Sequence, residues 1–538
     1  MSALGALVAL APFELAPIGG ESYFAVAIRP VLLLQLAVGV VVVALSVGGA
    51  FGPGAGRPPI WLGRAAAVLV VAVWISAAAG RHLPIGAAGA TVVTAFVATV
   101  VATAAVVSAD DEVARILRWM VGGAVVGAAI GLVVHAVGAE VGPTAWLHGE
   151  VTRIGLQHRL TRPWPHANVA AMALVVALVV QLGLDRGVRE IRTVVGLALT
   201  SVALVLTYSR GGVVAALVGL VVVAALVRGR RLAVTAVVVV GVMGATALVS
   251  DGWVDRSSDD ASIVDFRADV AVAAALDVDA VDPPVVPVTL TNRSGRSWSA
   301  SGAEAVEISA RWMDGDGFVV DEQRWPLDTD LGPGSSRTVE LPLGVAVPDG
   351  DYVILWDVVI DGEAYFLQFS GGRSAMDVVV RGSDVGPVSG PPVVPARTDL
   401  NRDEIWTLAE EAFRDRPVIG VGPMQLVLQA REEIPNNRRF PGSHAHSLIW
   451  EPLSAWGLLG TIPFMVLLVG GAWAAWRRRA APTGPAVLGG LAVVYVHGLV
   501  EWPLGHVGMS IPMAALLGLA WSSVGAEPRA VAEVPGRA

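Results

Sequence analysis

The chain lacks two residue types altogether, because none of its 538 residues is cysteine or lysine. Without cysteine it can form neither a disulfide framework nor a thiolate metal site. Without lysine, basic contacts to a phosphate fall to arginine, whose planar guanidinium offers a bidentate fork. Charged residues are also scarce, at 15% of the chain against 54% hydrophobic residues. This composition is too apolar for a soluble protein of this length and predicts several membrane spans.

Apolar runs long enough to cross a bilayer, which takes about 20 residues, recur along the chain. They lie at 2–18, 30–50, 62–80, 85–108, 116–137, 167–184, 191–207, 211–228, 232–250, 447–475, 484–501 and 506–524. A long polar segment, from about Asp251 to Pro441, separates the first nine runs from the last three. We therefore expect an α-helical polytopic membrane protein with about twelve transmembrane helices. The first run contains Glu14 and lacks a basic flank, which favours an uncleaved membrane segment over a signal peptide.

The arginines predict the orientation of these helices. They gather in alternate short loops, which the positive-inside rule assigns to the cytoplasm. These arginines are Arg57, Arg64, Arg115, Arg118, Arg186, Arg189, Arg192, Arg228, Arg230, Arg231, Arg477, Arg478 and Arg479. Both termini are then cytoplasmic, and the long polar segment lies outside together with the loops 138–165, 208–211 and 502–506.

Strand patterns dominate the first part of the polar segment, from 263 to about 381. Short runs such as 305–312 alternate apolar and polar residues, and turns rich in Gly, Asp and Asn, such as 292–295 and 314–317, separate them. These features predict a small β-sandwich outside the membrane. A linker rich in Gly, Pro and Val follows, and 402–416 predicts an amphipathic helix suited to the outer membrane boundary.

These patterns divide the chain into five parts. Residues 1–262 form the first nine transmembrane helices, 263–397 an inserted extracytoplasmic β-sandwich with its linker, 398–446 an outside helix and loop, 447–526 the last three transmembrane helices, and 527–538 a cytoplasmic tail.

The junction between the polar segment and the tenth apolar run carries His444-Ala-His446-Ser447, followed by Glu451. Ionisable groups are costly at a membrane and need a reason to be there. A neutral histidine can accept a proton from an attacking hydroxyl, so His446 is a candidate general base, with His444 orienting it or binding a sugar. The alternative is a histidine pair that caps the following helix. We expect no metal, because no further cluster of zinc ligands is evident in the sequence.

Two other outside segments offer arginines. Ser209-Arg210-Gly211 lies in a very short connection between two apolar runs, where the guanidinium either binds a phosphate near the lipid headgroups or anchors the interface. Arg402 begins an Arg-x-x-x-Trp segment that leads to a Gly-rich turn at 417–423. It is either a second arginine facing the same site or part of an ordinary solvated helix.

The loop from 153 to 168 places positive charge outside, against the usual bias, which an anionic ligand or a headgroup contact explains. Its polar residues are Arg153, His158, Arg159, Arg162, His166 and Asn168. The aspartate pairs at 259–260 and 314–316 are compatible with a metal-dependent glycosyltransferase, but the second pair falls in a predicted hairpin turn, where Asp serves the backbone.

Together these segments resemble the O-antigen ligase and polymerase superfamily of bacterial membrane glycan transferases. The turn 209–211 is similar to that family's Ser-Arg-Gly turn, and 402–422 to its Arg-x-x-x-Trp…Pro-x-x-Gly-x-Gly segment. The segment 444–460 is similar to its His-x-His-Asn…Glu…Gly-Leu-Leu-Gly signature. The order of the three motifs and their placement among the spans also match. Two positions depart from the pattern, because Ser447 replaces Asn and Ala455 replaces Glu.

The resemblance covers about 1–260 and 398–524, leaving the β-region as an insertion. It implies an inverting transfer of a glycan from a polyprenyl-diphosphate carrier to an acceptor hydroxyl, at the outer face of the bacterial plasma membrane. His446 would take the hydroxyl proton, while Arg210 and Arg402 would neutralise the departing diphosphate. Further substrate contacts are expected from His444, Ser209, Arg153, Arg162, Asn168, Ser447 and Glu451.

Three functions stay open at this point. The first is a glycan ligase or polymerase whose β-sandwich holds an acceptor or a growing glycan. The second is a protein O-oligosaccharyltransferase, which differs in its acceptor. The third is a transporter or flippase of lipid-linked glycans, which twelve spans with intramembrane charges such as Glu14 and Glu501 also fit. The expected partners are the lipid-linked donor, a glycan, lipid or protein acceptor and membrane lipids, with no nucleic acid and no cofactor.

Overall fold

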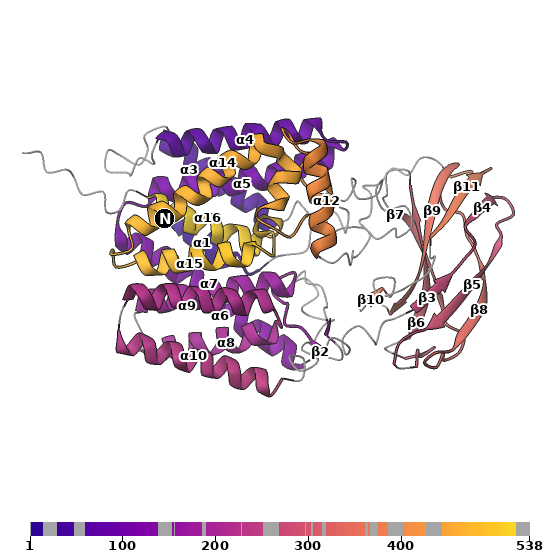
Figure 1. The fold of residues 1–538 in the computed structure, drawn as a ribbon, viewed down its shortest axis with the longest axis horizontal. Helices are drawn as coiled ribbons and strands as arrows, with labels where there is room; N and C mark the ends of the chain where they lie inside the picture. Colours follow the sequence, from indigo (N-terminus) through magenta and orange to yellow (C-terminus); the bar gives the residue numbers. More distant parts are fainter. Residues whose placement is uncertain are drawn as a thin grey trace, which may run out of the picture.

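The structure, a computed structural model, separates a helical part from a region of β-strands (Figure 1). It describes residues 2–13, 30–47, 60–137, 153–154, 157–185, 190–227, 229–250, 268–295, 297–302, 305–314, 319–360, 364–365, 375–385, 402–426 and 444–522. The strands lie to one side of the helical part, beyond the end at which α12 stands.

Helices account for nearly every apolar run of the sequence. They are α1 (Ser2–Leu10), α3 (Pro30–Val47), α4 (Ile60–Ala79), α5 (Leu83–Val106), α6 (Asp110–Val137), α7 (Ala167–Asp185), α8 (Ile191–Leu206), α9 (Arg210–Val227), α10 (Arg230–Leu248), α12 (Arg402–Asp415), α14 (Trp450–Arg477), α15 (Gly484–Gly498) and α16 (Val507–Trp521). A 3-10 turn, η3 (Pro503–Gly505), precedes α16.

Seven of the described helices are long and apolar enough to cross a membrane, namely α4, α5, α6, α7, α9, α10 and α14. Shorter apolar stretches lie at Leu32–Val41 of α3 and over α8, α15 and α16. The chain is therefore membrane-embedded and largely helical, as the composition predicts. The count of about twelve spans stays a prediction.

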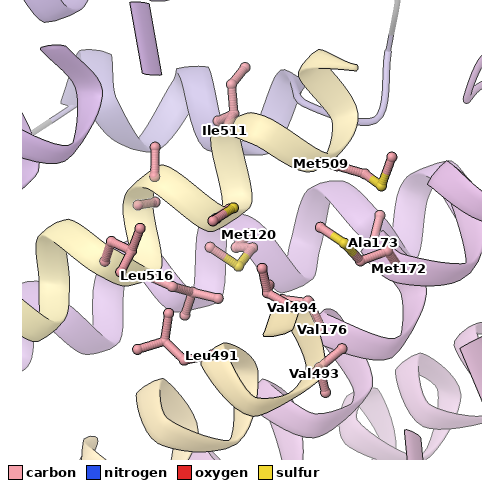
Figure 2. Close-up of a cluster of buried hydrophobic side chains, with 14 of the residues drawn as sticks. Met120, Met172, Ala173, Val176, Leu491, Val493, Val494, Met509, Ile511 and Leu516 are labelled. Carbon is pink, nitrogen blue, oxygen red and sulfur yellow. The ribbon is translucent and has the colours of Figure 1, made fainter. Parts of the chain in front are cut away.

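Helix α7 lies at the centre of the helical part. Its residues are buried on every face, which is the pattern of a helix enclosed by other helices. Figure 2 shows Met172 and Val176 of α7 meeting side chains from α6, α15 and α16, such as Met120, Leu491 and Leu516. Small residues permit the close approach: a Cβ on Gly183 would lie 2.6 Å from the Cα of Ala486.

Helix α14 is interrupted at Gly457, whose φ of 59° and ψ of −165° are not helical. The segment that follows α12 satisfies the backbone groups freed by this break. The amides of 458–459 donate to the carbonyls of 417–418, and the amides of 421–422 donate to the carbonyls of 454–455, at 2.8–3.0 Å. The Gly-rich turn and the glycines of α14, two separate features of the sequence, therefore form one unit in the fold.

Helix α12 buries the apolar side that the sequence predicts. Ile405, Leu408, Ala409 and Ala412 are all buried. Three of them form one cluster with Val421, Leu426 and Ala445, and Trp450 packs against that cluster. The apolar side of α12 therefore packs within the protein, against the loop and helix start that carry the two histidines.

The strands form two larger sheets and a short hairpin. They are β1 (Arg153–Ile154), β2 (Gln157–His158), β3 (Ala268–Ala271), β4 (Ala275–Asp279), β5 (Val285–Asn292), β6 (Val306–Met313), β7 (Val319–Pro326), β8 (Ser336–Pro342), β9 (Gly350–Ile360), β10 (Ala364–Tyr365) and β11 (Ala375–Arg381). One sheet has the order β4-β11-β9-β6-β7, with β10 added to β9, and the other has the order β3-β5-β8. Neighbours are antiparallel except the parallel pair β4 and β11.

Both larger sheets contribute to one hydrophobic cluster that includes Val288, Leu290, Trp312 and Trp356. The short strand-like runs of the sequence, such as the alternating run 305–312, correctly predict β5, β6, β8 and β9. Most of the turn predicted at 314–317 lies outside the described residues. A buried ion pair joins β6 to β9, with Arg311 Nη2 3.1 Å from Asp357 Oδ2.

Candidate functional site

The ring of His446 faces the carboxylate of Glu501, with Nδ1 2.5 Å from Oε1. His446 stands in the loop before α14, and Glu501 follows α15. The Glu501 side chain is 3% exposed, whereas that of His446 is 28% exposed. One edge of the imidazole is therefore anchored on a buried carboxylate while the ring keeps access to its surroundings.

Glu501 is held by further donors. The side-chain amide of Asn168 donates to Oε2 at 2.9 Å, and the backbone N–H of Trp502 donates to Oε1 at 3.2 Å. A carboxylate surrounded by donors is stabilised in its ionised form. With Glu501 ionised, Nδ1 of His446 is the donor to Oε1, and in the neutral form of the ring Nε2 is then the acceptor nitrogen.

Asn168, the second residue of α7, is oriented by two donors of its own. Its Oδ1 accepts from Arg159 Nη2 at 3.2 Å and from Ser209 Oγ at 3.0 Å. This fixes the amide with its nitrogen toward Glu501. Arg159 is tied in turn to the end of α8, because its Nε donates to the carbonyl of Thr207 at 2.8 Å.

Ser209 also caps α9, because its Oγ accepts from the N–H of Gly212 at 3.2 Å. The connection from α8 to α9 contains only the residues 207–209, and Tyr208 turns it with a φ of 50°. A Cβ on Gly211 would lie 3.1 Å from Val500 Cγ2. The start of α9 therefore packs directly against the segment that carries Glu501.

The backbone of the histidine segment is held from three sides. Ala445 donates its N–H to Oε2 of the buried Glu451 at 2.7 Å. The carbonyl of Ala445 accepts from Trp406 Nε1 of α12 at 3.1 Å. The N–H of Leu448 donates to the carbonyl of Gly498, at the end of α15, at 2.7 Å. These bonds join α12, α14 and α15 at the site.

His446 itself has a φ of 47°, which is left-handed and unusual for a residue with a side chain. Such conformations cost about 1–3 kcal/mol and persist where the surrounding contacts impose them, commonly at functional sites. Ser447, which follows, accepts bonds at its Oγ from the N–H groups of Ile449 and Trp450 at 3.2 and 3.4 Å. Its hydroxyl therefore satisfies two backbone N–H groups at the start of α14.

His444 completes a group of three possible metal ligands. Its Nε2 lies 3.8 Å from Glu501 Oε1, and its ring centroid lies 4.2 Å from that of His446. The ligand atoms of His444, His446 and Glu501 all lie within 4.8 Å of one another. The sequence argument against a metal assumed that no further ligand lies near the histidines, and Glu501 corrects that assumption.

Burial and charge oppose one another at this group. Burial alone raises the pKa of the Glu501 carboxyl, but the facing rings of His446 and His444 outweigh burial and hold that pKa well below its ordinary value. Burial lowers the pKa of His444, and the neighbouring His446 lowers it further. The site therefore favours an ionised Glu501 beside a neutral His444.

The structure brings most of the predicted site residues to one place. His444, His446, Ser209 and Asn168 belong to the connected group, while Ser447 and Glu451 support its backbone. The predicted arginines are less closely placed. Arg210, the first residue of α9, is exposed next to Ser209, and Arg162 is half-buried in the loop before α7. Arg153 begins β1 and Arg402 begins α12, but their side chains lie outside the described residues.

Two residues at the centre of the group have no role in the sequence-based site. Glu501 is recognisable in the sequence as an ionisable residue at the end of an apolar run, but the sequence does not show which residue it contacts. Arg159 is one of several basic residues in its loop, and no local pattern indicates that it bonds Asn168 and the end of α8.

No family model and no curated protein matches the chain. Among solved structures, it is similar to the alkylpurine DNA glycosylase AlkC of Pseudomonas fluorescens bound to DNA containing an abasic site analog. That similarity has a TM-score of 0.15 and 11% identity, and it covers 60% of this chain and 97% of that chain. A TM-score this low carries no argument about fold or function.

Proposed function

We propose that the protein is a membrane glycan transferase that moves a glycan from a polyprenyl-diphosphate carrier to an acceptor hydroxyl. The observation that carries the proposal is the 2.5 Å contact between His446 Nδ1 and the buried Glu501 carboxylate, next to an imidazole that stays partly exposed. This is the arrangement of a general base whose tautomer is set by a carboxylate.

In the proposed reaction, the acceptor hydroxyl attacks the anomeric carbon of the lipid-linked glycan. A new carbon–oxygen bond forms on one face, and the bond to the diphosphate oxygen breaks on the other, with its electron pair leaving on the diphosphate. Nε2 of His446 takes the hydroxyl proton. Glu501 then stabilises the resulting imidazolium through Nδ1.

Positive charge is available for the leaving diphosphate at the start of α9. Arg210 is exposed there, at the N-terminus of a helix, whose dipole favours an anion. Arg402, at the start of α12, is the second candidate, because Trp406 of the same helix bonds the backbone between the two histidines. The arginines act in this scheme by fixed charge, a contribution that a metal ion makes in other transferases.

The placement of the site favours a transferase over a transporter. The histidine segment is bonded to α12, which stands at the end of the helical part nearest to the strands (Figure 1). The other end of α14 carries Arg477 and precedes Arg478 and Arg479, which the positive-inside rule assigns to the cytoplasm. In this proposal about twelve helices span the plasma membrane, both termini are cytoplasmic, and the strands lie outside, where they hold an acceptor or a growing glycan.

A deletion strain tests the function directly. Surface glycans and carrier lipids are analysed in the deletion strain and after complementation with the natural chain or with His446→Gln. Short unpolymerised units after deletion indicate a polymerase, and polymer retained on the carrier lipid indicates a ligase. We expect His446→Gln to behave as the deletion does. Glycans and carrier lipids that do not change on deletion rule out the proposal.

Metal independence has its own test. Purified full chain in lipid nanodiscs, supplied with a lipid-linked donor and an acceptor, should transfer glycan at full rate in EDTA. A strict requirement for added Mg²⁺ would contradict the role assigned to the arginines.

A further inference from the structure

The group formed by His444, His446 and Glu501 has the composition of a metal site as well as of a base. Two imidazoles and one carboxylate form a donor set that zinc uses in open sites, with a fourth position left for water. We propose that these three side chains bind a divalent transition metal ion, typified by zinc, and that the bound ion switches off the base His446. The proposed metal binding does not depend on the proposed function, and only the switch rests on that function.

The distances place the three ligands close to the geometry that zinc needs. Bonds of about 2.0–2.1 Å to a tetrahedral ion put neighbouring ligand atoms about 3.3 Å apart. Oε1 of Glu501 now lies 2.5 Å from His446 Nδ1 and 3.8 Å from His444 Nε2. The first contact must open, and the second must close, by less than about 1 Å each.

The surroundings hold the ligands without closing the site. Asn168 fixes Oε2 of Glu501, so that Oε1 stays directed at the two rings. A Cβ on Gly505 would lie only 3.3 Å from His444 Nε2, so the glycine leaves room for this ring. The partial exposure of His446 gives an ion access from one side. The proposed metal site therefore shares His446 with the proposed transfer reaction.

The switch follows from the two nitrogens of one ring. Without metal, Nδ1–H of His446 donates a hydrogen bond to Glu501, and Nε2 keeps the lone pair that takes a proton from the hydroxyl. When the Nδ1 lone pair binds the ion, the single ring proton of the neutral imidazole moves to Nε2 by way of solvent. Nε2 then donates instead of accepting. Occupation by the ion and action as a base are mutually exclusive.

Binding is tested with the metal alone. The purified full chain, stripped with a chelator, is titrated with zinc chloride by calorimetry, alongside Glu501→Gln and His444→Gln. His135→Gln is the matched control, because this histidine stands in the last turn of α6. We expect about one tight zinc per chain and at least about tenfold weaker binding in both site variants. Unchanged affinity in Glu501→Gln and His444→Gln, or no binding at all, overturns the site.

The switch is tested in the transfer assay. Zinc should inhibit the natural chain at the concentrations that occupy the site, and EDTA should restore the rate. His444→Gln, compared with its own zinc-free rate, should need about tenfold more zinc for the same inhibition. Zinc that binds at the site without slowing transfer overturns the switch. A chain that transfers no glycan overturns the proposed function and the switch that rests on it, while the calorimetric result still decides the metal site.

Discussion

Nδ1 of His446 lies 2.5 Å from Oε1 of Glu501, although 55 positions separate the two residues in the chain. The bond from Leu448 N–H to the carbonyl of Gly498 closes this distance, because it joins the start of α14 to the end of α15. Asn168 then fixes the carboxylate from α7. The orientation of the ring therefore depends on the packing of helices and not on its own loop alone.

His446→Gln should lower the rate of glycan transfer by about 10²- to 10⁴-fold, the contribution that a general base makes. Glutamine has a similar size but accepts no proton at neutral pH. The measurement is turnover by purified chain with a lipid-linked donor, with carrier binding measured separately and expected to persist. His135→Gln, in α6, should keep the natural rate. Full turnover in His446→Gln would remove the base assignment.

Glu501→Gln should lower kcat by about 10-fold or more and leave KM nearly unchanged, because the side chain is 3% exposed and acts through the ring. Glu501→Asp keeps the charge and should recover part of the loss. Nitrogen NMR of labelled histidine, with His446→Gln to assign its signals, should show the Nδ1–H tautomer in the natural chain and a mixture in Glu501→Gln. A higher KM with unchanged kcat would mean that Glu501 binds substrate instead.

Asn168→Asp should damage the site more than Asn168→Ala. The aspartate keeps the acceptor for Arg159 and Ser209, but it replaces the donor that lies 2.9 Å from Glu501 Oε2 with a negatively charged oxygen. Like charges at such a distance in a buried site are strongly unfavourable. Turnover and thermal stability in detergent are the two measurements. Equal losses for both substitutions would show that only the bond, and not the charge, is important.

Much of the fold follows from local pattern. Apolar runs predict α7 and α9 within one or two residues, since a membrane span needs only length and low charge. Alternation of apolar and polar residues predicts β6 for a similar reason. The break in α14 is different: Gly457 and the turn 417–422 are each visible in the sequence, but their pairing is a tertiary event.

The site, like the fold, contains residues that the sequence indicates and contacts that only the tertiary structure supplies. His444 and His446 stand out because ionisable residues at an apolar boundary are rare. Glu501 is visible by the same criterion, yet the fold supplies its partner from a distant segment, and with it the third metal ligand. Arg159 shares a loop with other arginines, and only the path of the chain past the end of α8 selects it as the donor to Asn168.

Asp357→Asn should destabilise the sheets by about 3–5 kcal/mol, the cost of leaving one charge of a buried ion pair without its partner. Asp357 and Arg311 are 0% and 5% exposed. The control is Asp269→Asn, whose partner Arg293 is 57% exposed and whose loss should cost at most about 1 kcal/mol. Proteolysis of the full chain in increasing urea, with cuts mapped to 268–381, measures the difference. Equal effects would mean that burial does not govern this pair.

Gly457→Ala should destabilise the chain, because the backbone of this glycine has φ 59° and ψ −165°, a combination that is nearly restricted to glycine. The conformation alone costs on the order of 1–3 kcal/mol with a side chain. In addition, the new Cβ would lie 2.4 Å from the carbonyl carbon of Val418, which is backbone and cannot rotate away. Thermal unfolding in detergent should show a clear drop in midpoint.

Gly241→Ala in α10 provides the opposite case. Among the described residues, no atom outside the neighbouring backbone of its own helix lies within 4 Å of a Cβ built there, so alanine should stabilise the helix by about 0.5–1 kcal/mol. A general effect of added methyl groups would move both midpoints in the same direction. Movement in opposite directions would show that the fold that holds His446 requires the break in α14 and the segment 417–422 that fills it.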